Sequence, residues 1–250
     1  MFVLLGALII GISLGLFGSG GSILTVPVLL YLLQMPAELA IASSLLIVAG
    51  ISLLGSAQNA WQKRISWRHL WWFGVPGMFG TYGGAWIGTL VDSRWQLLVF
   101  AILMVVAAIF MWRNNQQETA NQRPFQPAKV VADGLVVGAI TGFVGVGGGF
   151  LIVPALVLMA GLPLGIAVAT SLGIIAMKSF AGFTKYYLAF SAAGMSFNWQ
   201  VIAIMVVAGF IGSFAGNWLG QKLPKAKLQK GFALFLAVMA VVVISQSVLK

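Results

Sequence analysis

Two glycine-rich runs, at 18–22 and 145–149, are the segments of this chain best suited to binding a ligand. Each run lies between two apolar blocks. Glycines at the start of a helix leave backbone N–H groups free and accessible, and the helix dipole is positive there. Two such helix starts facing inward would form a cradle for an anion. The residues that we expect to contribute are Gly18, Ser19, Gly20, Gly21, Ser22, Gly145, Gly147, Gly148 and Gly149.

The alternative is that glycine here only allows helices to cross closely, as small-xxx-small patterns do. Four glycines suit that explanation: Gly11, Gly15, Gly138 and Gly142. A glycine run is poor for a plain helix. The runs 18–22 and 145–149 therefore favour a binding site.

Lys178 lies near the middle of the apolar segment 164–188. A lysine at membrane depth costs about 2.5–3.5 kcal/mol on insertion scales, so it usually faces a cavity and has a function. Its counterpart in an internal repeat described below is Ile51, so the positive charge is present once. Such a cation beside a symmetric site would suit one bound anion. The alternative is snorkelling to the interface, which suits Lys185 better.

Four hydroxyl residues occupy equivalent places in the two halves of the chain: Ser43, Ser44, Thr170 and Ser171. Their hydroxyls could complete the shell of an anion. They could equally bond backbone carbonyls within their own helices. The sequence leaves both roles open.

Enzyme and metal chemistry have little support. The four acidic residues are scattered among loops, which offers no paired carboxylates for acid–base catalysis. The chain has no cysteine and one histidine, so thiolate and histidine metal sites are not expected. No Gly-Lys-Ser/Thr follows the glycine runs, which argues against a nucleotide loop. A dyad of Ser19 with His69 is disfavoured, because His69 abuts a basic loop. We expect no catalytic residue, metal or cofactor.

Two of the acids have ordinary structural explanations. Glu38 follows Pro36 and resembles a first-turn helix acid, and Asp133 begins an apolar segment. Neither is well placed to carry a proton. A coupling proton remains a candidate partner, carried by the lysine or by the substrate itself.

The composition is that of a membrane protein. Hydrophobic residues make up 60% of the chain and charged residues 7%, whereas a soluble domain is about 25% charged. The net charge of +10 comes mainly from short loops between apolar blocks. A nucleic-acid surface would need a basic stripe on a polar domain, so no nucleic acid is expected. The lipid bilayer is the expected environment.

The apolar blocks predict ten helical segments separated into two halves by a polar linker at 113–129. Tryptophans crowd the segment ends, as in the aromatic belts of membrane proteins. The predicted segments are 2–17, 22–33, 38–57, 69–90, 95–112, 130–145, 149–160, 164–188, 199–218 and 230–248.

The two halves are copies of one unit. Residues 11–47 match 138–174 without a gap at a spacing of 127, and 15 of these 37 positions are identical, including Pro27 over Pro154. At a spacing of 132, residues 77–88 match 209–220, with tryptophan in register. We therefore assign a first membrane repeat to 1–112 and a second to 130–250.

Loop charge indicates that the copies are inverted. The loop at 61–68 is basic and its counterpart near 188–195 is uncharged, whereas the loop at 221–230 is basic and its counterpart at 91–95 is balanced. Because basic loops stay in the cytoplasm, equivalent loops should lie on opposite sides of the membrane. Loops 61–68, 113–129 and 221–230 are then cytoplasmic and both termini lie outside. The alternative is that the swap is a coincidence.

The paired glycine motifs, each followed by Val-Pro and a second proline, resemble the sulfite exporter TauE/SafE family. Gly20-Gly21 with Pro27 and Gly147-Gly148 with Pro154 carry the resemblance, which covers both halves. It implies a duplicated multi-pass protein of bacterial cytoplasmic membranes that moves sulfite, sulfonates or other organic anions. The first copy departs from the second by having Ser19 and Ser22 in place of Val146 and Gly149.

The sequence thus predicts an all-α integral membrane protein with two inverted-topology repeats and broken helices at the glycine motifs. Its predicted function is secondary transport of a small anion across a bacterial inner membrane, a mechanism that often uses inverted repeats. The alternatives are a passive anion channel, which would differ in turnover and coupling, and a membrane scaffold, which has no need of a buried lysine. The transported anion, the direction, the coupling ion and the oligomeric state are left open.

Overall fold

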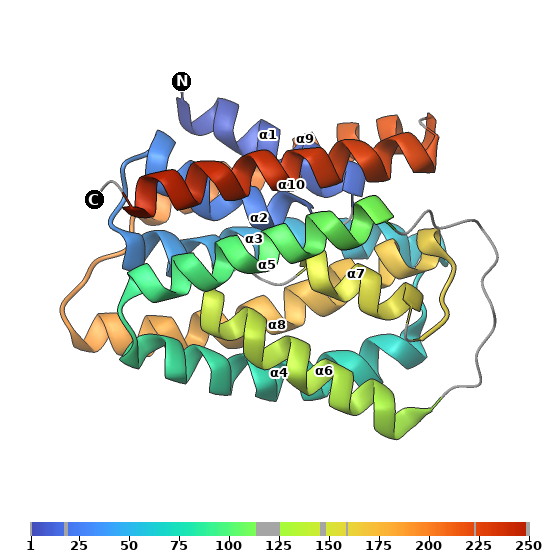
Figure 1. Cartoon of the computed structure of the whole chain (residues 1–250), viewed down its shortest axis with the longest axis horizontal. Coiled ribbons are helices and arrows are strands. Elements are labelled where there is room, and N and C mark those ends of the chain that lie inside the picture. Colours follow the sequence, from blue (N-terminus) through green and yellow to red (C-terminus); the bar gives the residue numbers. More distant parts are fainter. Residues whose placement is uncertain are drawn as a thin grey trace.

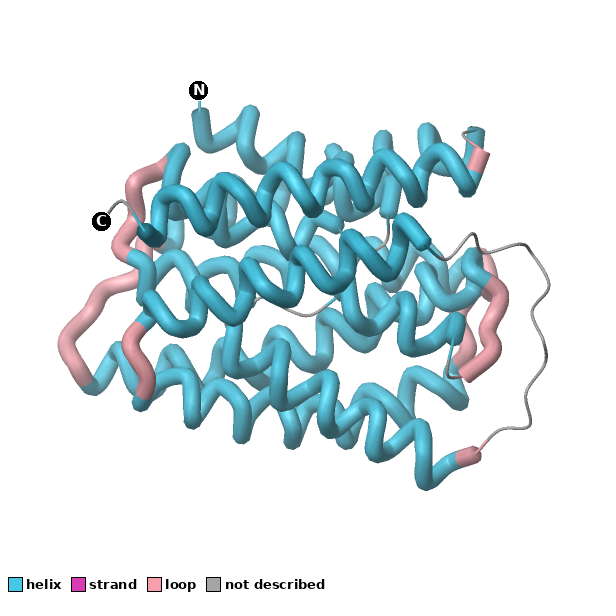
Figure 2. The backbone as a smooth tube through the Cα atoms, viewed as in Figure 1, coloured by secondary structure: helices cyan, strands magenta, loops and turns pink. Residues whose placement is uncertain are grey.

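The computed structural model describes residues 2–17, 20–113, 126–145, 149–158, 160–222 and 224–248. Gly18, Ser19, Gly147 and Gly148, and most of the linker, lie outside these ranges. Every regular element in the described part of the chain is a helix (Figures 1 and 2). The elements are α1 (Phe2–Phe17), α2 (Gly20–Pro27), the π-helix η1 (Val28–Leu32), α3 (Ala37–Trp61), α4 (Trp67–Leu90), α5 (Ser93–Arg113), α6 (Pro127–Val144), α7 (Gly149–Leu158), α8 (Leu164–Ala192), α9 (Trp199–Lys222) and α10 (Lys225–Val248). Each predicted segment corresponds to one helix, except that 22–33 is divided between α2 and η1.

The helices are those of a membrane protein. Four of them contain stretches long and apolar enough to cross a bilayer: Ala37–Trp61, Pro127–Val144, Gly165–Ala192 and Trp199–Gly220. Large apolar side chains also cover much of the outer surface, among them Phe79, Trp86 and Ile211. A soluble monomer rarely exposes so much contiguous apolar surface. Lipid contact explains both features, and the prediction of an all-α multi-pass membrane protein is confirmed.

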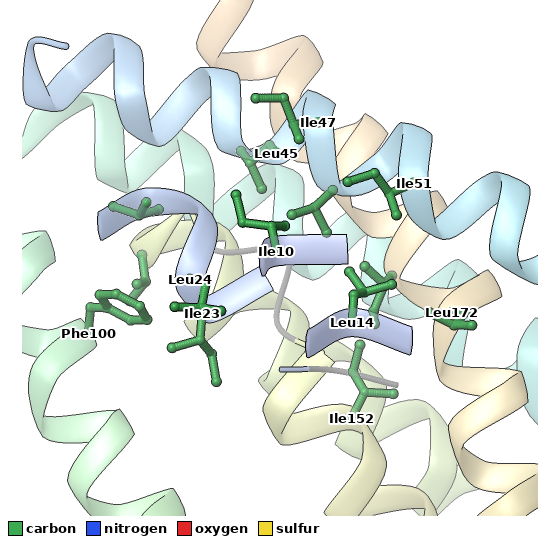
Figure 3. Packing of buried hydrophobic residues seen from close by; sticks show 14 of the residues in the cluster. Ile10, Leu14, Ile23, Leu24, Leu45, Ile47, Ile51, Phe100, Ile152 and Leu172 are labelled. Atoms are coloured by element: carbon green, nitrogen blue, oxygen red, sulfur yellow. The ribbon is translucent and has the colours of Figure 1, made fainter. Parts of the chain in front are cut away.

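The first two helices form a hairpin. A Cβ atom at Gly6 in α1 would lie 2.7 Å from Cγ1 of Val28 in η1, and one at Gly21 in α2 would lie 2.5 Å from the carbonyl oxygen of Ile10. The start of α1 therefore lies beside η1, and the start of α2 lies beside the middle of α1. Apolar side chains of this hairpin gather with those of α3 in the core, as Figure 3 shows for Ile10, Leu14, Ile23, Leu45 and Ile51.

The two halves pack crosswise, each contributing its first helix to the other half. Helix α1 packs on α9, and its repeat counterpart α6 packs on α4. Both crossings use equivalent glycines. A Cβ at Gly11 would lie 2.9 Å from Cα of Gly209, and one at Gly138 would lie 3.0 Å from Cα of Gly77. The predicted role of Gly11, as a residue that allows close helix crossing, is confirmed.

Two adjacent glycines of α4 test this packing. A Cβ at Gly84 would lie 2.9 Å from the backbone nitrogen of Phe143, whereas one at Gly83 would meet nothing within 4 Å. We expect Gly84→Ala to lower the free energy of unfolding by about 1–3 kcal/mol, because the backbones cannot separate locally. Gly83→Ala should be neutral or stabilise by up to about 1 kcal/mol through helix propensity. Thermal unfolding of the purified variants in detergent would measure both, and equal effects would contradict the crossing.

The long helices α3 and α8 run antiparallel through the middle of the bundle. A Cβ at Gly182 would lie 3.3 Å from Cδ1 of Leu45, and a Cβ at Gly55 would lie 3.4 Å from Cδ1 of Leu172. Both contacts give the same register. In that register Lys178 lies opposite Ala49, which is the middle residue of α3.

The bundle has two distinct ends. The N and C termini lie at one end, together with the loops before α3, between α4 and α5, and between α8 and α9 (Figures 1 and 2). The end of α5, the start of α6, the α3–α4 loop and the α9–α10 turn lie at the other end. This second end, called the basic end below, carries the basic loops at 61–68 and 221–230, together with Arg113 and Lys129 at the described edges of the linker.

Candidate functional site

Lys178 is the charged residue buried most deeply among the described side chains. It is fully buried in α8, and it is among the largest side chains removed from the surface. Its place opposite the middle of α3 puts it far from both ends of the bundle. A lysine at that depth is too far from the interface to snorkel, and lysines buried at membrane depth usually face a cavity or a ligand.

The Lys178 side chain lies between α8 and α4. A Cβ at Gly77 would lie 3.0 Å from Cδ and 3.4 Å from Cε of Lys178, so glycine makes room for the lysine stem. The ammonium lies 5.8 Å from the centroid of the Phe73 ring, within the range of a cation–π contact. Its Nζ atom has no hydrogen-bond partner in the described part of the chain. An ammonium has three donors, and leaving them unpaired in the core is costly. A bound anion would satisfy them.

The other half contains the same slot without the charge. Ile51 is the counterpart of Lys178, and Gly209 is the counterpart of Gly77. A Cβ at Gly209 would lie 3.0 Å from Cγ1 of Ile51, so the pair packs as Lys178 packs on Gly77. The structure therefore keeps the duplicated geometry while giving one copy a cation. The difference in charge between Lys178 and Ile51 therefore occurs in two slots that have equivalent backbone packing.

Buried hydroxyls without partners accompany this region. The Oγ atoms of Ser52 and Ser179 have no hydrogen-bond partner among the described residues, and neither do those of Ser13 and Ser43. Ser179 is adjacent to Lys178, and Ser52 is its counterpart at the spacing of 127. Buried hydroxyls usually have a partner, so these four can still receive one from water or a ligand. The sequence analysis did not predict Ser52, Ser179 or Phe73 as site residues. The repeat spacing relates Ser52 to Ser179, and this is the signal that could have drawn attention to the two serines.

The four predicted hydroxyl residues have different surroundings. Ser44 Oγ lies 2.8 Å from the carbonyl oxygen of Gly145 and 2.7 Å from that of Ile41. Thr170 Oγ1 accepts a 2.9 Å hydrogen bond from the backbone N–H of Ser66, and Ser171 Oγ donates to Val168 O at 2.7 Å. Ser44 thus ties α3 to the end of α6, and Thr170 ties α8 to the start of α4.

Ser44 and Ser43 provide a matched test of these roles. We expect Ser44→Ala to lower the free energy of unfolding by about 0.5–1.5 kcal/mol, because it removes the hydrogen bond to Gly145. Ser43→Ala removes an unpaired buried hydroxyl and should be neutral or stabilising. Denaturation curves of the two variants would decide, and a larger loss for Ser43→Ala would contradict the assignment.

The described helix ends that precede the two glycine breaks, those of α6 and α1, lie toward opposite ends of the bundle. Gly145 ends α6 with a left-handed φ of 72°, and the preceding turn lies beside Gly88, near the end of α4. In the first copy, Leu16 lies beside Gly220, near the end of α9 at the basic end. Gly20 and Gly21 begin α2, and Gly149 begins α7. Ser22 is buried in α2.

The hydroxyl pairs are separated in the same way. In the antiparallel register, Ser44 and the position opposite Ser171 are about 18 Å apart along α3, given about 1.5 Å of rise per residue. The structure therefore brings Gly145 together with Ser44, and it keeps the two hydroxyl pairs apart. Lys178 lies between the two levels.

His69 has a local partner. Its Nδ1 atom lies 2.8 Å from Ser66 Oγ, just before the start of α4. Ser19, the other member of the disfavoured dyad, lies outside the described residues. No group of three or more metal-ligating side chains was found in the part of the chain that the structure describes.

Comparisons with known proteins agree with this architecture. The sequence model of the family described as "Sulfite exporter TauE/SafE" matches residues 3–243. A relative from Xylella fastidiosa is 32% identical over 96% of this chain and 92% of its own length. A relative from Haemophilus influenzae is 31% identical over 96% of this chain and 95% of its own length. A third, from Methanocaldococcus jannaschii, is 28% identical over 92% and 90%. All three are described as probable membrane transporter proteins. No solved structure gives a significant match.

Proposed function

Because this chain belongs to the sulfite exporter TauE/SafE family, we propose that it is a secondary transporter that carries a small anion across the bacterial inner membrane. The observation that carries the proposal is the fully buried, unpartnered ammonium of Lys178 halfway along a membrane-spanning helix. The family and the names of the relatives point to a membrane transporter rather than an enzyme.

The substrate is a small anion such as sulfite, an organosulfonate, or a related sulfur-containing or carboxylate anion. Its negative charge offsets the cost of the buried ammonium, and its oxygens accept hydrogen bonds from Nζ. The hydroxyls of Ser179 and Ser52 have no hydrogen-bond partner among the described residues, so they can donate further hydrogen bonds to the anion. Phe73 and Gly77 shape the slot and leave Nζ as its polar end.

In the proposed transport cycle, the two glycine breaks bind the anion one after the other. The backbone N–H groups at the starts of α2 and α7 are the donors that we expect to contact it there. The anion passes from one break to Lys178 and then to the other, with Ser22, Ser43, Ser44, Thr170 and Ser171 lining or supporting these positions. In this proposal the anion occupies two positions on one path instead of a single shared cradle.

The halves are inverted repeats that rock against each other. Support comes from the crosswise packing of α1 on α9 and α6 on α4, through equivalent glycines. It also comes from Figure 1, in which α5 ends at the basic end while α10, its counterpart, ends beside the C terminus. Because the two halves use equivalent helix packing, the site can open to either side of the membrane when the halves move as rigid bodies.

The basic end faces the cytoplasm, and single cysteines can test this orientation. The chain has no cysteine, so one introduced thiol is unambiguous. Gln62 and Ser196 are exposed in loops at opposite ends. We expect Ser196→Cys to react with a membrane-impermeant maleimide in intact bacteria, and Gln62→Cys to react only after the cells are opened. Labelling of Gln62→Cys in intact cells would contradict the orientation.

Anion flux into proteoliposomes tests the function itself. Sulfite, sulfate, thiosulfate, taurine, sulfoacetate and a short carboxylate should be compared, with and without an imposed pH gradient. A carrier gives saturable uptake that is accelerated by unlabelled substrate on the opposite side, whereas a passive channel gives no such acceleration. Absence of flux for every anion, from protein shown to be folded, would contradict the transport proposal.

A further inference from the structure

A small pocket lies at the end of the bundle opposite the basic loops. It is formed where α3 begins, α4 ends, α5 begins and α8 ends, and its cavity volume is about 40 Å³. Five of its lining residues have polar side chains: Glu38, Thr89, Ser93, Gln96 and Tyr186. No lysine, arginine or histidine lines it.

Gln96 lines this pocket, and its side-chain oxygen is buried and has no hydrogen-bond partner among the described residues. Its side chain is only 3% exposed, although α5 has just begun. The amide nitrogen Nε2 donates hydrogen bonds to the carbonyl oxygens of Gly88 and, at 3.3 Å, of Val91. Two carbonyl neighbours fix the amide orientation, since an oxygen in that place would be repelled. Oε1 therefore faces away from them, and it has no hydrogen-bond partner among the described residues.

The hydroxyl oxygens of Tyr186 and Thr89, which also line the pocket, can accept hydrogen bonds from a ligand but cannot donate them. The Tyr186 hydroxyl donates to the carbonyl oxygen of Phe143 at 3.1 Å. The Thr89 hydroxyl donates to the carbonyl oxygen of Trp86 at 2.8 Å. With those protons engaged, each oxygen can only accept from a ligand in the pocket. Together with Gln96 Oε1 and the Glu38 carboxylate, the pocket offers oxygen acceptors to a positively charged guest.

We propose that this pocket binds a monovalent cation, sodium in the first instance, through Glu38, Gln96, Thr89 and Tyr186. Oxygen atoms are the ligands that hard cations prefer. A divalent ion is usually held by more than one carboxylate, whereas this pocket has one. A single carboxylate with several neutral oxygens balances a single positive charge.

The pocket adjoins the second glycine break. Tyr186 donates to the last turn of α6, and Ile41, which lines the pocket, lies against Gly145. A cation here would fix the ends of α3, α4, α5 and α8 beside the place where α6 stops. It would also place a positive charge next to one of the two anion positions. This coupling role, unlike the cation site itself, rests on the proposed function.

Thermal unfolding in detergent tests the cation site without any anion substrate. Intrinsic tryptophan fluorescence should be followed in sodium chloride and in choline chloride at matched ionic strength. We expect sodium to raise the Tm by about 3 °C at concentrations near ten times its Kd. Glu38→Gln keeps the shape of an exposed side chain and should abolish the sodium-specific rise. Gln96→Leu should do the same.

Asp92→Asn is the matched control. Asp92 lies at the same end of the bundle, its carboxylate accepts a 2.8 Å hydrogen bond from the backbone of Arg94, and it does not line the pocket. This variant loses the same charge and should keep the sodium response. An equal Tm in sodium and choline for the unmodified chain would overturn the cation site, and so would a sodium response that survives Glu38→Gln.

Anion flux under a sodium gradient then tests the coupling separately. We expect flux to rise with an inward sodium gradient and to lose that dependence in Glu38→Gln. Flux that depends on the pH gradient and not on sodium would overturn coupling through this pocket. Sodium-specific stabilisation without flux of any anion would leave the cation site standing and count against the proposed function instead.

Discussion

Lys178→Met should abolish anion flux while making the protein more stable. Methionine keeps most of the length of the lysine stem beside Gly77 but removes the charge. Loss of one partner of a buried ion pair costs about 3–5 kcal/mol, which corresponds to a 100-fold to 1,000-fold loss of affinity or more. Without substrate, the ammonium is unpaired in the core, so its removal should relieve part of an insertion cost of about 2.5–3.5 kcal/mol. We expect the Tm to rise by about 5 °C.

Lys185→Met is the matched control for this variant. Lys185 is two turns further along α8, is partly exposed and lies 5.7 Å from the Tyr82 ring. Removing its charge should leave flux within about twofold of the unmodified chain, because only a surface cation is lost. Flux in proteoliposomes and thermal unfolding in detergent would be measured on both variants. Normal flux in Lys178→Met would exclude the lysine from the site, and a lower Tm would show that Nζ has a structural partner.

The opposing signs of the two effects distinguish a binding lysine from a structural one. A lysine that served the fold would lose stability and flux together. A lysine kept for a ligand is a local cost to the empty protein, which the ligand offsets when it binds. Substrate should therefore raise the Tm of the unmodified chain and leave that of Lys178→Met unchanged.

The sequence predicted the helices well because the bilayer imposes a strong local rule. Apolar length alone located segments such as 2–17 and 69–90, which became α1 and α4 within two residues. The duplication and the family resemblance were also visible, since proline and tryptophan repeat in register, and the match over residues 3–243 confirms the family. The lysine stood out because a charge is rare at that depth.

What the sequence did not reveal depends on contacts between distant residues. Ser44 and Gly145 are 101 residues apart, and no local pattern predicts their hydrogen bond. The separation of the two hydroxyl pairs follows from the antiparallel register of α3 and α8, which the repeat alone does not give. Gln96 was overlooked because a polar residue at a helix start is usually exposed, and only the carbonyls of Gly88 and Val91 bury its amide.

Ile51→Lys should prevent folding, because it would place a second ammonium in the core. Ile51 is fully buried and packs against Gly209, in the slot equivalent to that of Lys178. A second lysine adds another insertion cost of about 2.5–3.5 kcal/mol and a like-charge repulsion, against a typical total stability of about 5–15 kcal/mol. We expect little monodisperse protein in size-exclusion chromatography. Ile51→Met, a volume-conserving change, should elute normally.

The double variant Ile51→Lys with Lys178→Ile tests whether the two slots are equivalent. It carries one buried lysine, as the unmodified chain does, but in the first copy. Because Gly209 makes the same room for residue 51 that Gly77 makes for residue 178, we expect the folded yield to recover. Phe73 has Met205 as its counterpart, so the moved ammonium would lose its aromatic neighbour and anion flux should stay low. Failure of the double variant to fold would mean that the surroundings of Lys178 are specialised for charge beyond what the duplicated backbone provides.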